Sequence, residues 1–176
     1  EKDITLAVAT FVEKELARSG NLQVRLTRTA DKDVSLKERI KFIQSARPDV
    51  LISIHVNAGF DKKSAGYELY FPGFKAAAGA GNESKAILKD MTKNKHLNDS
   101  VKLAHTISRN LAAVFPKKDR GLREAPLQIL EGLSVPAVVI ELGFATRTED
   151  SEMLMKESAQ QNIARAIAKG IVEALK

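Results

Sequence analysis

Apolar residues recur every three to four positions in several stretches of the chain, and this spacing is typical of helices with one buried face. The predicted helices cover residues 4–16, 36–46, 101–115 and 163–175. The second pattern opens with Ser35 and Glu38, which have the spacing of a capping box, in which each side chain bonds to the backbone N–H of the other residue. A helix start at this point is therefore expected.

Other stretches have the patterns of β-strands. Residues 22–28 and 65–71 alternate between apolar and polar side chains. "VLISI" (50–54) and "AVVIEL" (137–142) are almost continuously apolar, as strands covered on both faces are, and "LQIL" (127–130) is a further candidate. Largely alternating helices and strands predict an α/β fold, with a mostly parallel or mixed twisted sheet and helices on both faces in three layers.

Residues 1–176 are expected to form one domain, because chains of about 100–200 residues usually share a single core. The segment 74–100 does not fit the regular alternation, since it begins with an Ala/Gly tract and has few apolar anchors. A connection of this length inside a compact domain is usually functional or disordered. We interpret it as an insertion that carries a short helix from about Asn82 to Met91.

Composition narrows the class of protein. The chain has 28 Lys and Arg against 22 Asp and Glu, for a net charge of +6, which favours partners such as an acidic cell-wall polymer or anionic lipid. Nucleic acid is disfavoured because the basic residues are scattered and aromatic residues do not interleave with them. No apolar run reaches the roughly 18 residues of a membrane span. Without cysteine, any metal would need His, Asp or Glu ligands.

Two predicted core strands carry polar side chains at their carboxyl ends. His55 follows "VLISI", and Glu141 is the penultimate residue of "AVVIEL". Ligands of open α/β sheets bind beyond these strand ends, and a metal would compensate both groups for lost solvation. Alternatively, His55 is a hydrogen-bonded strand-end histidine and Glu141 belongs to a buried ion pair. Asn57 shares a face with His55 if the strand continues, where it could orient substrate or a ligand, or form a turn.

Several motifs follow one another in a specific order over nearly the whole chain: "LTR", "SLKERI", "LISIHVNA", "GYELYF" and "PAVVIELGFATRTED". This combination resembles the zinc-dependent N-acetylmuramoyl-L-alanine amidases of the amidase-3 type. The resemblance implies hydrolysis of the amide bond between N-acetylmuramic acid and L-alanine, with peptidoglycan as the substrate and zinc as the cofactor.

The resemblance also implies site residues. His55 matches one zinc-binding histidine, and Glu141 matches the catalytic glutamate. Glu1 matches the zinc-binding glutamate at the start of the family's first helix. The family's first zinc-binding histidine lies in a turn ahead of that helix, so we expect this chain to lack that ligand and its N-terminal strand. Without the resemblance, Glu1 would be interpreted as a disordered terminal residue.

Amidases of this type that serve daughter-cell separation are similar in having a long insertion after the "GYELYF" strand, from which a helix covers the zinc and offers it a glutamate. Glu83 is the only glutamate of residues 74–100. The resemblance implies autoinhibition by Glu83, an activator protein of the division machinery that binds the 82–97 region, and a periplasmic location. Alternatively, Glu83 only stabilises a helix N-terminus through its charge.

Two functions of other classes stay open at the level of sequence. One is a non-catalytic cell-wall-binding or regulatory module, and the other is a zinc peptidase that acts on another amide. The joint presence of Glu1, His55 and Glu141 counts against the first, because a binding module does not need all three. The termini of the products would distinguish the second.

Overall fold

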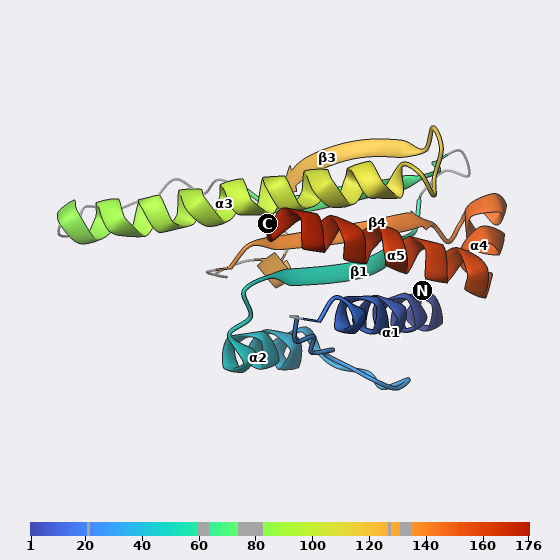
Figure 1. Ribbon diagram of the computed structural model, residues 1–176, viewed down its shortest axis with the longest axis horizontal. Helices are drawn as coiled ribbons and strands as arrows, with labels where there is room; N and C mark the ends of the chain where they lie inside the picture. Colours follow the sequence, from blue (N-terminus) through green and yellow to red (C-terminus); the bar gives the residue numbers. More distant parts are fainter. Residues whose placement is uncertain (21, 60–63, 74–82, 127, 131–134) are drawn as a thin grey trace.

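A computed structural model describes residues 1–20, 22–59, 64–73, 83–126, 128–130 and 135–176, with the backbone alone for 83–94 and 130. The elements are α1 (Lys2–Arg18), α2 (Leu36–Ala46), β1 (Leu51–Asn57), β2 (Tyr67–Pro72), α3 (Glu83–Leu111), β3 (Asp119–Ala125), the 3-10 helix η1 (Gln128–Leu130), β4 (Ala137–Phe144), α4 (Thr148–Leu154) and α5 (Glu157–Ala174). The strands form one sheet in the order β1-β4-β2-β3 (Figure 1). The predicted fold class is confirmed.

The two faces of the sheet differ in character. β1 pairs with β4 and β2 with β3 in parallel, while β2 and β4 are antiparallel. One face contributes apolar side chains such as Ile54 and Ile140 to a core shared with α1, α3 and α5. Because successive strand residues point to opposite faces, His55, Glu141 and Glu68 lie on the other face. We call it the polar face.

Helices cover the apolar face through the stripes that the sequence predicted. The buried stripes are Val8, Val12 and Leu16 in α1 and Ile163, Ile167 and Ile171 in α5. Each such side chain contributes about 1.5–3 kcal/mol when fully buried. α3 and α5 pack so closely that a Cβ at Gly170 would lie 2.6 Å from the Cα of Ile107. Glycine is therefore required at this crossing.

α2 forms part of the third layer, on the side of the polar face. The capping box is confirmed: the Glu38 backbone N–H donates to Ser35 Oγ (3.3 Å), and the Ser35 backbone N–H donates to the Glu38 carboxylate (2.8 Å). α2 contacts η1, whose Ile129 packs against Val139 on the polar face. Helices on both faces therefore complete the three layers.

The prediction of a strand over residues 22–28 is wrong, because the structure has no strand there. The segment alternates as a strand does, but alternation does not supply a hydrogen-bonded neighbour, and a ladder needs one. Residues 22–28 and the edge strand β1 both line a cavity of about 1330 Å³, together with α1 and α2. The segment is thus buried on one side without joining the sheet.

α3 is one continuous helix of 29 residues, where two separate helices were predicted. At about 1.5 Å per residue it is roughly 43 Å long, and Figure 1 shows its first turns projecting beyond the sheet, away from the chain's N-terminus. Residues 74–82 of the predicted insertion lie outside the described residues. None of the described helices is both long and apolar enough to cross a membrane.

β3 was not predicted, and the predicted strand "LQIL" is wrong, since residues 128–130 form η1. "DRGLREA" has no regular apolar alternation because β3 is an edge strand with only Leu122 and Ala125 as apolar side chains. Its pairing with β2 steps from Tyr67↔Asp119 to Leu69↔Leu122, so β3 has one extra residue, a β-bulge. Gly121 lies within the bulge at a φ of 90°, which L side chains rarely adopt.

Candidate active site

His55, near the carboxyl end of β1, contacts Glu1, which precedes the first turn of α1. The Nδ1 atom of His55 lies 3.1 Å from Oε1 of Glu1, although the residues are 54 positions apart in the sequence. On the other side of the ring, Nε2 lies 2.8 Å from the hydroxyl of Ser53, which shares the polar face. Ser53 therefore fixes the ring with Nδ1 toward Glu1. Both side chains of the pair are about half exposed, so solvent and ligands reach them.

Glu141 lies beside this pair, because it is the register partner of His55 in the β1–β4 ladder. Burial is the largest cause that raises the pKa of Glu141, and together with the charges of Glu1 and Glu68 it raises this pKa to about 7. Its Oε2 atom is buried and has no hydrogen-bond partner within the described residues. A carboxyl group that takes up and releases a proton near neutral pH is suited to general acid–base chemistry.

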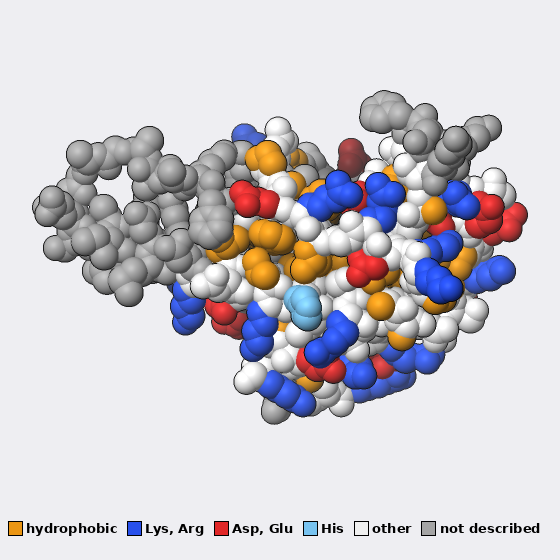
Figure 2. Space-filling model, turned by 90° about the horizontal axis from the view of Figure 1, so that it is seen from above, with side chains coloured by type: hydrophobic (Ala, Val, Ile, Leu, Met, Phe, Trp, Pro, Cys, Tyr) orange, Lys and Arg blue, Asp and Glu red, His pale blue; other side chains and the backbone are white. Residues whose placement is uncertain are grey.

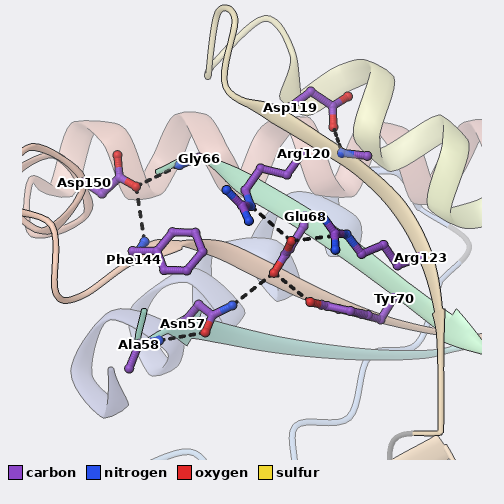
Figure 3. A network of polar contacts seen from close by, with 11 residues as sticks. Asn57, Ala58, Gly66, Glu68, Tyr70, Asp119, Arg120, Arg123, Phe144 and Asp150 are labelled. Carbon is purple, nitrogen blue, oxygen red and sulfur yellow. Dashed lines mark hydrogen bonds and ion pairs between the residues drawn. The ribbon is translucent and has the colours of Figure 1, made fainter. Parts of the chain in front are cut away.

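Glu68 extends this arrangement across a third strand. It is the register partner of Glu141 on β2, so His55, Glu141 and Glu68 form a row across β1, β4 and β2. Glu68 is only 3% exposed, which makes its partners essential, since a buried carboxylate without partners is costly. Its oxygens accept hydrogen bonds from three side chains (Figure 3): Asn57 Nδ2 at 3.1 Å, Tyr70 Oη at 2.7 Å and Arg120 Nε at 3.1 Å.

Asn57 contacts both Glu68 and the turn that follows β1. β1 continues to Asn57, so the residue shares the polar face with His55. Its amide nitrogen bonds to Glu68, and its Oδ1 accepts the backbone N–H of Ala58 at 2.8 Å, which shapes the turn after the strand. A contact of Asn57 with substrate stays a prediction.

The sequence analysis missed Glu68 as part of this site. The available indication was a glutamate between Tyr67 and Leu69 in an otherwise apolar strand. A pattern shows that such a residue faces away from the apolar core, but it does not show that Arg120 and Tyr70 bury it.

A second carboxylate missed by the sequence analysis, Asp150, fixes the loop after β4. Asp150 is 1% exposed and accepts the backbone N–H groups of Gly66 (2.9 Å) and Phe144 (3.2 Å) (Figure 3). It also accepts the ammonium of Lys118 at 2.8 Å. Burial raises its pKa, but these donors outweigh burial and lower the pKa below its usual value. Asp150 thus joins the start of β2 to the carboxyl end of β4, which follows Glu141.

Glu1 and His55 are donors of the types that zinc accepts. Catalytic zinc sites usually take three protein ligands and keep a further position for water. No group of three or more His, Cys, Asp or Glu side chains in the described part of the chain is arranged to hold a metal. The described residues therefore fit zinc in donor type and offer two candidate donors, Glu1 and His55.

The prediction for Glu83 concerns a side chain outside the described residues. Glu83 is the first residue of α3, and the side chains of Ile87, Leu88 and Met91 also lie outside what the structure describes. Figure 1 shows α3 beginning at the end of the molecule away from the chain's N-terminus. The role of Glu83 stays a prediction.

Comparison with known proteins shows the family of this chain. Residues 1–173 match the family described as N-acetylmuramoyl-L-alanine amidase. This chain belongs to that family. The amidase LytC of Bacillus subtilis (strain 168) is 31% identical over 172 residues, which cover 98% of this chain and 30% of LytC. The chain thus spans less than a third of that relative.

Solved amidase structures share the fold. The catalytic domain of CwlV from Bacillus (Paenibacillus) polymyxa var. colistinus superposes with a TM-score of 0.78 at 29% identity, covering 99% of this chain and 84% of that one. The CwlD amidase of Clostridioides difficile, solved in complex with the GerS lipoprotein, gives 0.81 at 26% identity, with coverages of 99% and 86%. The family membership that the motifs predicted is confirmed, and with it the enzyme class: a peptidoglycan hydrolase.

Proposed function

We propose that this amidase domain is zinc-dependent, with Glu1 and His55 as two of the zinc ligands and Glu141 as the catalytic acid–base. One observation carries the proposal. The contact between Glu1 and His55 lies directly beside a carboxyl group whose pKa is raised to about 7. A structural ion pair would not require the third group to be partly buried without a hydrogen-bond partner.

In this mechanism Glu141 moves one proton. It takes the proton from a water molecule that attacks the carbonyl carbon of the amide between the lactyl group and L-alanine. As the C–N bond breaks, Glu141 gives the proton to the alanine nitrogen. The stem peptide leaves with a free amino end, and N-acetylmuramic acid keeps the new carboxyl group, which ionises by releasing the second proton of the water to the amine or to solvent. Zinc, when bound, lowers the pKa of water to about 7 and stabilises negative charge on the carbonyl oxygen.

The bond cleaved is open to a direct test. Purified peptidoglycan incubated with the protein and zinc should release stem peptides that begin with L-alanine, which mass spectrometry identifies. A zinc peptidase that acts on another amide would expose different termini, and a non-catalytic binding module would release no peptide. Either result would contradict the proposal.

We also propose that this protein is a periplasmic enzyme. It would remodel the cell wall during daughter-cell separation, and an activator protein would control it. The similarity of the motifs to cell-separation amidases supports this. CwlD, which has the same fold, is solved with a protein partner. A net charge of +6 suits a polymer rich in carboxylates.

Autoinhibition by Glu83 and an activator site at residues 82–97 stay predictions. The Glu83→Ala variant should then hydrolyse purified peptidoglycan several-fold faster than the wild type without activator, because it lacks the carboxylate that competes with water. Glu157→Ala is the matched control, since it also removes a glutamate from the first position of a helix. Basal activity of Glu83→Ala equal to that of the wild type would exclude Glu83 as the inhibitory group.

A further inference from the structure

The β3 bulge turns two arginines toward one buried carboxylate. Residues three apart in a regular strand point to opposite faces. The extra residue in β3, with Gly121 at a φ of 90°, changes this alternation, so that Arg120 and Arg123 both lie beside Glu68 on the polar face (Figure 3). Bulges commonly redirect side chains next to active sites.

The two arginines are not equivalent. Arg120 donates to Glu68 Oε2 at 3.1 Å, and its guanidinium lies 5.0 Å from the ring centre of Phe144. The Nε atom of Arg123 is 3.6 Å from the same oxygen, too far for a hydrogen bond, and its side chain is 52% exposed against 32% for Arg120. Arg120 therefore makes the closer contact with Glu68, whereas Arg123 is held beside Glu68 by a longer ion pair and presents a more exposed guanidinium to a ligand.

Arg123 and Glu141 lie two strands apart in the sheet. Arg123 pairs with Tyr70 on β2, and Tyr70 with Val139 on β4, two residues before Glu141. Neighbouring strands are about 4.8 Å apart, so β3 is roughly 10 Å from β4. The side chain of Arg123 shortens this gap by reaching to 3.6 Å from Glu68, the register partner of Glu141. Two residues of extended peptide span at most about 7 Å, so this reach is what brings Arg123 within range of the residue after the alanine.

We infer that Arg123 binds a carboxylate of the stem peptide, on the residue that follows the L-alanine at the scissile amide. This rests on the proposed function, which places the alanine nitrogen next to Glu141. The carboxylates near this bond belong to the leaving peptide, because the lactyl carboxyl is itself part of the amide. Arg123 thus directs the peptide across β2 and β3, and the sugar toward β1. A guanidinium suits this task because it can donate two parallel hydrogen bonds to a carboxylate.

General basic charge does not account for such a preference. Figure 2 shows Lys and Arg side chains at several places on one face of the molecule, with Asp and Glu side chains between them. A diffuse charge of this kind attracts the whole polymer. Selection of one carboxylate needs a fixed donor, which the contact with Glu68 provides at Arg123.

Two soluble substrates test the inference: N-acetylmuramoyl-L-alanyl-D-glutamine with a free α-carboxylate, and its α-amide. The wild type should favour the carboxylate in kcat/KM by about tenfold or more, the range of a charge-assisted hydrogen bond. Arg123→Ala should remove this preference by raising KM for the substrate with the free α-carboxylate. Its kcat on that substrate, and its kcat/KM on the α-amide substrate, should change little. Arg165→Ala, an exposed arginine on α5, is the control and should keep the preference.

If Arg123→Ala lowered kcat/KM equally on both substrates, Arg123 would act only through Glu68, and the inference would be overturned. An unchanged preference would overturn it too. Calorimetric titration with the product dipeptide L-alanyl-D-glutamine tests the site without turnover, and binding that is equally tight to the wild type and Arg123→Ala would contradict it. If the wild type cleaved neither substrate, the proposed function would fail, while the titration would still decide for or against Arg123.

Discussion

Replacing Glu141 by glutamine should lower kcat on peptidoglycan by about 10²–10⁴-fold, the contribution typical of a general acid–base. The glutamine side chain has nearly the same shape, but it neither takes a proton from water nor gives one to the alanine nitrogen. Substrate binding should change little, so KM should stay close to the wild-type value. The rate of release of stem peptides, followed by mass spectrometry, measures the effect.

The unfolding temperature of Glu141→Gln distinguishes a loss of catalysis from misfolding. The buried Oε2 atom of Glu141 has no hydrogen-bond partner among the described residues, and burial disfavours its ionised form, so Glu141→Gln should unfold at the same temperature or a higher one. Glu152→Gln, an exposed change on α4, should keep full activity. A Glu141→Gln variant that retained more than about a tenth of the wild-type kcat would fall outside the range expected for an acid–base.

The pH dependence provides a second measurement on Glu141. The residue acts as a base only when ionised, so wild-type activity should fall as the pH drops below its pKa. That pKa is about 7 in the protein without metal, and a zinc ion nearby shifts the fall to lower pH by favouring the carboxylate. Glu141→Gln should lack this acidic limb in its residual activity.

The second large effect is expected at His55. His55→Ala should lower zinc affinity by at least about 100-fold, because even the outer partners of metal ligands contribute 10–100-fold and His55 would itself be a ligand. Zinc bound per chain after dialysis against limiting zinc, measured by elemental analysis, should fall accordingly, and clearing of purified cell walls should stop.

The controls for His55 use another histidine and a chelator. His105→Ala, an exposed change on α3, should leave zinc content and activity unchanged. Chelation should abolish wild-type activity, and added zinc should restore it. Wild-type zinc content in His55→Ala, or full activity of the wild type in the presence of chelator, would contradict the proposed metal role.

Much of the fold could be predicted because the corresponding patterns report burial directly. The apolar stripe of α5 and the continuous apolar run of β4 each bury the residues that the periodicity selects. The capping box of Ser35 and Glu38 was equally clear, because its contacts lie within four residues. Burial of one face and contacts between nearby residues produce regular spacings of residue types, which can be recognised in the sequence.

The errors concern pairing, which leaves no such trace. Residues 22–28 alternate without having a partner strand, whereas β3 has a partner without alternating, because it is a charged edge strand with a bulge at Gly121. The long α3 was divided in two because few apolar residues mark its first half. Whether an extended segment joins a sheet depends on distant backbone groups.

The sequence by itself determined the family, through its ordered motifs, and the α/β class, through its alternating patterns. It also singled out His55 and Glu141 as candidate site residues, because polar residues near the ends of apolar strands interrupt an otherwise regular pattern. Only the tertiary structure decided what surrounds them. Folding brings Glu1 to His55 across 54 positions and places Glu68 next to Glu141. The proton affinity of Glu141 arises from burial and from these neighbouring charges, which depend on distances in space.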